Sequence, residues 1–217
     1  CENCGTPYWG ILGETGIWPL RAVVEYHRLM FIKNVINSDD ERLAKKIING
    51  QKQISGENWT NETELIGINH VINMNKITEM KKYEWKKKVK ENIQKTVEKE
   101  WNDRSRKMKK MRHVREGKFG KKEYFIESTT EEVTEYLKIR LEMKDIGNNQ
   151  GKARKCKCEE EESIEHLLKC AKINQDEGGN NATIEDFKSE KRSRLEQARR
   201  WIKRYLEIRE NESREEK

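Results

Sequence analysis

Four residues in the last third of the sequence combine soft metal-ligating side chains at short spacing. They are Cys156, Cys158, His166 and Cys170, in a C-x-C-x7-H-x3-C pattern. Three thiolates and one imidazole fill the tetrahedral shell of a zinc ion and leave no position for a substrate or an activated water. The pattern therefore predicts one structural zinc ion. The alternative is that Cys170 is an ordinary buried thiol and His166 a polar residue on an amphipathic helix.

The elements that must position these ligands can also be predicted. Cys156 and Cys158 lie in a charged stretch that suits an extended or turn backbone. Ser163 is a suitable N-cap for a short helix, which would bring His166 and Cys170 onto one face because they are four residues apart. The remaining cysteines, Cys1 and Cys4, form an isolated C-x2-C pair whose role the sequence leaves open. An odd total of five cysteines fits a reducing compartment.

Composition argues for helices and against a large core. Only 33% of the 217 residues are hydrophobic against 39% charged, and the mean hydropathy is −1.12. Two prolines and 13 glycines leave long stretches free for helices. We expect a mainly α, elongated multi-helix module with a small zinc-knuckle segment and room for one short hairpin. Without an apolar run of membrane-spanning length or a signal peptide, the expected location is intracellular, in nucleus and cytoplasm. The chain starts at Cys1 without methionine and reads as a piece of a longer protein.

The first half of the chain predicts three helices and the start of a fourth. One begins at Trp18 and Pro19. Its apolar positions recur at helical spacing and are expected to face a core: Leu20, Val23, Val24, His27, Phe31 and Val35. A capping box of Ser38 and Glu41 opens the next helix, which ends at Gly50. A polar loop, 51–61, precedes a short helix with Leu65, Ile66, Ile68 and Val71. A long helix from about Thr78 to His113 then carries an apolar stripe at intervals of four: Trp85, Val89, Ile93, Val97 and Trp101.

The second half predicts a turn or short extended piece over 118–128. A helix capped by Ser128 or Thr129 follows and ends at Gly147. A link over 174–182 leads to a final amphipathic helix from about Thr183. Its apolar positions are Ile184, Phe187, Leu195, Ala198, Trp201, Ile202 and Leu206. The expected segments are 1–50 (helical pair), 51–147 (linker region and long basic helix), 148–173 (CCHC knuckle) and 174–217 (link and final helix).

Positive charge concentrates in one part of the chain. Residues 81–122 hold 18 Lys and Arg against 6 Asp and Glu, whereas the whole chain has a net charge of only +7. Such a stretch attracts phosphates without reading base sequence. The predicted nucleic-acid-binding residues on and after the long helix are Lys86, Lys87, Lys88, Lys90, Arg104, Arg106, Lys107, Lys109, Lys110, Arg112 and Arg115. Those beside the cysteine cluster are Lys152, Arg154, Lys155 and Lys157.

Three alternatives stay open at this point. In one, the chain is a helical interaction protein that pairs through its four-spaced stripe, and its lysines serve only solubility. A zinc hydrolase is disfavoured, because a filled CCHC shell lacks a vacant position. Trp85 and Trp101 suit packing better than base stacking, although either role fits their chemistry.

Several segments of the sequence resemble one known family. TPYWGILGETGIWPLRAVVEYHRLMFIKNVINSDDERLAKKI, ITEMKKYEWKKKVKENI, and YLKIRLEMKDIGNN followed by CKCEEEESIEHLLKC are similar to the C-terminal region of LINE-like non-LTR retrotransposon reverse transcriptases. The likeness covers nearly the whole chain, in the same order. It implies a mostly helical thumb or linker region beyond the polymerase palm, ending in a CCHC zinc knuckle.

The resemblance also implies a function. Cys156, Cys158, His166 and Cys170 would be the knuckle ligands, and the region would grip template RNA and target DNA during target-primed reverse transcription. The parent protein would be an RNA-directed DNA polymerase, with its polymerase portion upstream. This stretch has no Y-x-D-D motif of its own, so we expect no polymerase site in it. The ligand spacing is also longer than in retroviral knuckles, so retroviral packaging functions do not transfer.

Overall fold

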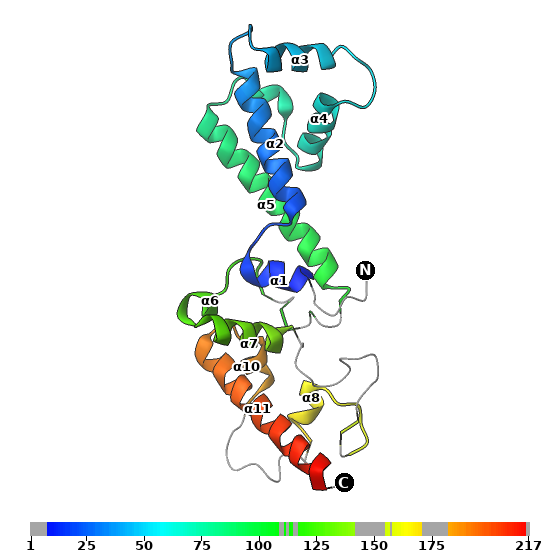
Figure 1. The fold of residues 1–217 in the computed structure, drawn as a ribbon, viewed down its shortest axis with the longest axis vertical. Helices are drawn as coiled ribbons and strands as arrows, with labels where there is room; N and C mark the ends of the chain where they lie inside the picture. The colour runs from blue at the N-terminus through cyan, green and yellow to red at the C-terminus, as the bar shows by residue number, and fades with distance from the viewer. Residues whose placement is uncertain are drawn as a thin grey trace. The chain divides into compact units, whose positions relative to one another are not determined.

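The computed structural model describes residues 8–108, 111, 113–114, 117–141, 155–156, 158–170 and 182–215. Within these residues the chain forms ten α-helices and one short 3-10 helix, and no strand (Figure 1). The predicted mainly helical fold is confirmed. None of these helices has the length and apolarity that a membrane crossing requires.

The chain divides into two compact units, one continuous in sequence and one made of two separate segments. One is continuous, Trp18–Trp101, and we call it the continuous unit. The other joins Cys1–Ile17 to Asn102–Lys217, and we call it the discontinuous unit. The helices of the continuous unit are α2 (Leu20–Ile36), α3 (Leu43–Gln51), α4 (Trp59–Asn69), the 3-10 helix η1 (Met74–Ile77) and α5 (Lys82–Ser105) as far as Trp101.

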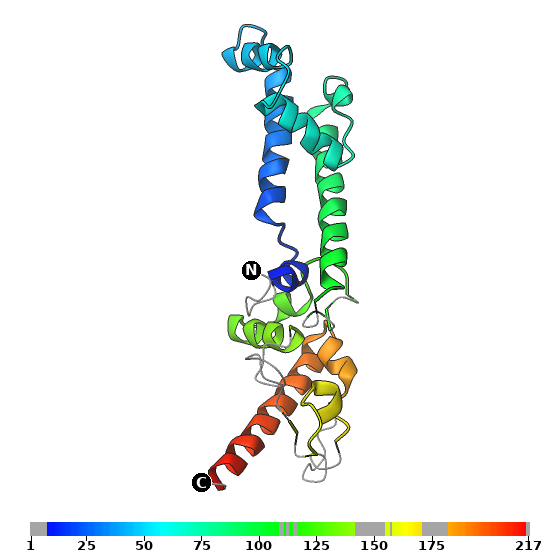
Figure 2. The same cartoon turned by 90° about the vertical axis from the view of Figure 1, so that its right-hand side faces the viewer.

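In the continuous unit, α2 and α5 lie side by side, as both views show (Figures 1 and 2). The indole Nε1 of Trp85 on α5 donates to the backbone oxygen of Leu29 on α2 at 3.1 Å. All five members of the predicted apolar stripe of α5 are at most 2% exposed. The stripe is thus confirmed as a packing surface, since full burial of such side chains contributes roughly 1.5–3 kcal/mol each.

The predicted core face of α2 is largely wrong. Leu20, Val24 and Phe31 are 75%, 56% and 52% exposed, whereas Ala22, Leu29 and Ile32 are buried. The helix is apolar on two sides, so its periodicity alone does not select the one that packs. The face with Leu29 is buried because α5 brings the Trp85 ring to it.

Two helix starts in this unit also differ from the prediction. Ser38 does not cap α3: its hydroxyl donates to the Val35 backbone oxygen at 2.6 Å, and Arg42 occupies the N-cap position. The helix α4 begins at Trp59, inside the segment expected to be a loop. Asn58 caps it by accepting from the Asn61 backbone N–H at 3.0 Å.

The discontinuous unit contains six helices in its described residues. They are α1 (Tyr8–Thr15), α6 (Tyr124–Glu127), α7 (Thr130–Arg140), α8 (Ile164–Leu167), α10 (Ile184–Lys188) and α11 (Arg192–Glu215). The capping box of α7 is confirmed, with Thr129 as N-cap and Glu132 as its partner. A turn is present before α6, where Gly120 has a φ of +144°, but the stretch then becomes helical and not extended.

The ends of the last predicted helices also change. The helix α7 ends at Arg140, earlier than the predicted Gly147, which lies outside the described residues. The predicted final helix is two helices, because the chain is not helical over 189–191 between α10 and α11. Its apolar positions Phe187, Leu195, Ala198, Trp201 and Ile202 are all buried, as expected.

A buried ion pair joins three segments of the discontinuous unit. Arg140 at the end of α7 donates from Nε and Nη2 to the two carboxylate oxygens of Glu14 on α1, at 2.6 and 3.0 Å. Its Nη1 donates to the backbone oxygens of Lys188 and Ser189, where α10 ends. The Tyr124 hydroxyl donates to the same Glu14 carboxylate at 2.8 Å. Both charged side chains are only 1% exposed.

Candidate metal centre

The predicted zinc ligands come from a turn and a short helix. An antiparallel bridge pairs Lys155 with Glu161, and the backbone N–H of Cys156 donates to the Glu160 oxygen at 2.8 Å. Glu159 closes the turn with a left-handed φ of 74°. This tight reversal brings the Cys156 and Cys158 side chains to the same side as α8.

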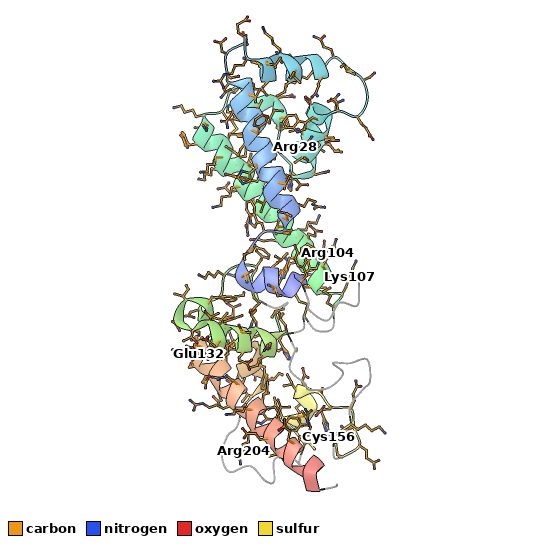
Figure 3. All side chains as sticks on the ribbon, viewed as in Figure 1. Arg28, Arg104, Lys107, Glu132, Cys156 and Arg204 are labelled. Carbon is orange, nitrogen blue, oxygen red and sulfur yellow. The ribbon has the colours of Figure 1, made fainter. Side chains whose placement is uncertain are left out.

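The helix α8 supplies His166, but it ends at Leu167, so Cys170 comes from the turn that follows and does not share a helix face with His166 as predicted. As predicted, Ser163 is the N-cap of α8, and the Ser163 hydroxyl accepts from the His166 backbone N–H at 3.1 Å. The Cys170 backbone N–H donates to the Leu167 oxygen at 3.4 Å, in the turn after the helix. The ligand atoms of His166 and Cys170 therefore lie close to those of the two cysteines of the turn, of which Cys156 is labelled in Figure 3.

The four ligand atoms are close enough together to hold one metal ion such as zinc. They all lie within 4.8 Å of one another. The sulfur atoms of Cys156 and Cys170 are 3.7 Å apart, close to the roughly 3.8 Å edge of a tetrahedron with zinc–sulfur bonds of about 2.3 Å. The Cys158 sulfur lies 3.0 Å from His166 Nε2, so this edge must open by about 0.5 Å to admit a zinc ion.

A carboxylate holds the histidine in the orientation that metal binding requires. His166 Nδ1 lies 2.9 Å from a carboxylate oxygen of Glu160. A ligating imidazole commonly donates its second N–H to a carboxylate, which fixes the tautomer and raises the basicity of the free nitrogen. With its proton on Nδ1, His166 would donate to Glu160 and present the Nε2 lone pair to the Cys158 sulfur. The three thiols and the imidazole, with the Glu160 carboxylate beside His166 Nδ1, therefore fit a metal ion.

The cluster is part of the core of the discontinuous unit. Cys156 and Cys170 are 6% and 7% exposed, and they pack in one hydrophobic cluster with Ile164, Leu167 and Trp201. Burial raises the pKa of Cys156 to about 11, against a hydrogen bond from the Cys158 backbone N–H that lowers it. A bound cation would offset this cost, because a metal deprotonates the thiols that coordinate it.

Polar contacts attach the cluster segment to α11. The hydroxyl of Tyr205 donates to the buried carboxylate of Glu162, and Arg209 Nη1 lies 3.7 Å from the same oxygen. The Tyr205 ring stacks on Trp201, with ring centroids 5.8 Å apart. Burial, with the Glu162 contact, raises the pKa of Tyr205 above its ordinary value, so its proton stays available for this bond. The position of the segment on α11 is therefore defined by side-chain packing and by hydrogen bonding.

We predict that Glu160→Gln weakens zinc binding about 10- to 100-fold without unfolding the protein. The amide keeps the shape of the side chain but withdraws the negative charge from the His166 ring. Affinity can be measured by competition with a chromophoric chelator. Glu161→Gln is the matched control, because Glu161 is the exposed neighbour in the same turn. Equal affinities for the two variants would show that Glu160 does not orient the ligand.

The predicted nucleic-acid-binding residues within the described part of the chain are mostly exposed. Lys86, Lys87, Lys90, Arg104, Arg106, Lys107 and Lys155 are exposed and Lys88 is half-buried. The remaining seven lie outside the described residues: Lys109, Lys110, Arg112, Arg115, Lys152, Arg154 and Lys157. Lys86, Lys87 and Lys88 are consecutive on α5, so their directions differ by about 100° each and they do not share one face.

Helical spacing finds a better-aligned set that the sequence analysis missed. Lys88, Lys95 and Lys99 lie seven and then four positions apart on α5, within about 40° of one another around the helix axis. Lys95 and Lys99 are exposed. These three lysines are not adjacent in the sequence, so a run of consecutive lysines does not indicate them. Their i, i+7, i+11 spacing does. We call Lys88, Lys95 and Lys99 the α5 lysine stripe.

Two other candidate features have a definite outcome. Trp85 and Trp101 are 0% and 1% exposed, so both are packing anchors and neither offers a ring face for base stacking. Cys1 and Cys4 lie outside the described residues.

Comparisons of the chain with protein-family models, with curated proteins and with solved structures found no match.

Proposed function

We propose that the chain is a nucleic-acid-binding region stabilised by one structural zinc ion. The observation that carries the proposal is the closed Cys156, Cys158, His166 and Cys170 cluster, whose ligand atoms lie within 4.8 Å of one another. It is embedded in a hydrophobic core, as expected for a metal that holds a fold. The exposed lysines of α5 supply the positive surface for phosphates.

In this proposal, the partners are RNA and DNA, bound largely without regard to base sequence. The resemblance to LINE-like reverse transcriptases supports this choice, and it makes the upstream polymerase portion of the same polyprotein a further partner. The region would hold template RNA and target DNA in nucleus and cytoplasm, and the polymerase reaction would belong to that upstream portion. A filled CCHC shell supports a structural and not a hydrolytic role for zinc.

The second candidate is a helical interaction protein, and one observation favours it. Leu20, Val24 and Phe31 form an exposed apolar stripe along α2. The α5 stripe on which this alternative first rested is buried within the chain, so α2 would have to supply the contact. A dimer seen by sedimentation that dissociates when Val24 is replaced by Asp, with no affinity for nucleic acid, would favour it.

The nucleic-acid proposal predicts a strong dependence of binding on salt. Each phosphate contact on duplex DNA contributes a slope of about −0.9 in log K against log salt. The variant Lys88→Gln/Lys95→Gln/Lys99→Gln should therefore bind more weakly and lose about 2 to 3 units of that slope. Fluorescence anisotropy with labelled RNA and DNA duplexes, at about 50 and 200 mM salt, measures both quantities.

The matched control removes the same charge elsewhere in the continuous unit. Lys45→Gln/Lys46→Gln/Lys52→Gln changes three lysines in and just after α3, where Lys45 pairs with Asp40 and Lys46 with Glu41. It should keep nearly the whole slope of the unmodified protein. Equal losses in the two triple variants, or binding that ignores salt, would exclude the α5 lysine stripe as the phosphate contact.

A further inference from the structure

An arginine and two aromatic residues form a cluster in the discontinuous unit that the metal centre does not use. The guanidinium carbon of Arg104 lies 4.8 Å above the centre of the Trp9 ring. Tyr8 packs edge-on against Trp9, with ring centroids 5.6 Å apart, and remains 51% exposed. Trp9 is half-buried and Arg104 exposed.

The chemistry of this cluster suits unpaired nucleobases. Bases of single strands stack on aromatic side chains and on the planar guanidinium of arginine. Arg104 lies over one face of the Trp9 indole, and its guanidinium is planar, cationic and exposed. Tyr8 adds an exposed ring beside it. Two flat surfaces of this kind can take neighbouring bases of one strand.

Positive side chains stand next to this surface. Lys107 follows Arg104 by one helical turn, with its backbone N–H donating to the Arg104 oxygen at 3.1 Å, and Arg106 lies between them. Both Arg106 and Lys107 are exposed, and Figure 3 shows Arg104 and Lys107 near α1. Asp103 is an exposed acidic neighbour and Glu100 lies one helical turn before Arg104, so three positive charges lie beside two negative ones. Phosphates that flank a stacked base would be attracted to this side.

We propose that Tyr8, Trp9 and Arg104 form a stacking platform for the bases of single-stranded nucleic acid, with Arg106 and Lys107 contacting its phosphates. This inference rests on the proposed nucleic-acid binding and adds a preference for unpaired strands. The α5 lysine stripe contacts phosphates of single strands and duplexes alike. The platform binds only bases that are not paired, because the faces of paired bases are occupied within the duplex.

The test separates stacking from charge. Tyr8→Leu removes the exposed ring and keeps apolar bulk, and Arg104→Lys keeps the charge and removes the planar surface. Each should weaken binding of a homopyrimidine 20-nucleotide single strand about 5- to 100-fold, as expected for losing one stacked base. Neither should change the affinity for a blunt duplex or its salt dependence. Fluorescence anisotropy with labelled strands of RNA and of DNA measures these affinities.

Two controls accompany these variants. Tyr83→Leu removes a tyrosine on α5 that is 66% exposed and lies outside the platform, so it should leave single-strand binding unchanged. An abasic strand of the same length keeps every phosphate and offers no base. The unmodified protein should bind it more weakly than Tyr8→Leu binds the normal strand, because the abasic strand loses both stacked bases.

The outcomes distinguish this inference from the function on which it rests. Equal binding of normal and abasic strands, with Tyr8→Leu and Arg104→Lys both without effect, would overturn the platform and leave salt-dependent phosphate binding intact. Loss of duplex binding in Arg104→Lys would also overturn the platform. It would show that Arg104 stabilises the fold and does not act by stacking on unpaired bases. An unmodified protein that binds no strand and no duplex would overturn both proposals.

Discussion

Replacing Arg140 with methionine should lower the free energy of unfolding of the discontinuous unit by about 3–5 kcal/mol. The variant is destabilised because Glu14 stays buried without the charge that compensates it. Glu14 would keep its charge with 1% of its side chain exposed and would lose both guanidinium hydrogen bonds. The backbone oxygens of Lys188 and Ser189 would lose their donor in the same step. Urea unfolding followed by circular dichroism measures the change.

A surface ion pair in the same unit is the control. Arg192 and Glu132 are 2.8 Å apart with side chains 45% and 19% exposed, so Arg192→Met should cost less than about 1 kcal/mol. The double variant Glu14→Met/Arg140→Met should recover much of the loss, because no charge then stays buried without its partner. If Arg140→Met costs no more than Arg192→Met, the pair with Glu14 does not hold the three segments together.

Replacing Cys170 with serine should remove the metal and loosen the core around it. We expect zinc content to fall from one ion per chain to none, since a hydroxyl is a much poorer zinc ligand than a thiolate. Cys156 and Cys170 pack with Ile164, Leu167 and Trp201, so the loss should reach α11. The melting temperature of the discontinuous unit should fall by more than about 10 °C.

Metal analysis and circular dichroism together test this prediction. Adding a strong chelator to the unmodified protein should reproduce the behaviour of Cys170→Ser. Cys4→Ser is the control for loss of a thiol, and it should keep one zinc ion per chain and an unchanged melting temperature. Zinc retained in Cys170→Ser, or identical melting of metal-free and metal-bound protein, would contradict a structural role for the cluster.

Several patterns that involve neighbouring residues were predicted well from the sequence, although the Ser38 capping box, which is equally local, was wrong. The ligand set, the Ser163 cap and the Thr129 capping box depend on residues within one or two helical turns, and all three appear as predicted. The α5 stripe was equally clear, because a polar helix with one apolar edge has only one face to bury. In these cases local chemistry leaves a single arrangement.

Features that depend on distant partners could not be predicted. The buried face of α2 depends on where α5 packs, and α2 is apolar on more than one side. The bond between Glu14 and Arg140 joins residues 126 positions apart, and nothing in either local sequence marks the other as its partner. The Arg104 and Trp9 contact is of the same kind. The contact between Glu160 and His166 could have been predicted from the sequence, because metal-ligating histidines commonly pair with a nearby carboxylate.

The division of the chain imposes an order on how the protein can form as it leaves the ribosome. The continuous unit, Trp18–Trp101, is a single stretch of chain and can fold as soon as that stretch has emerged. The first helix, α1, emerges earlier but must wait for Tyr124 and Arg140 before its Glu14 has its partners. During synthesis, α1 therefore lacks its packing partners for the time needed to add well over 100 residues.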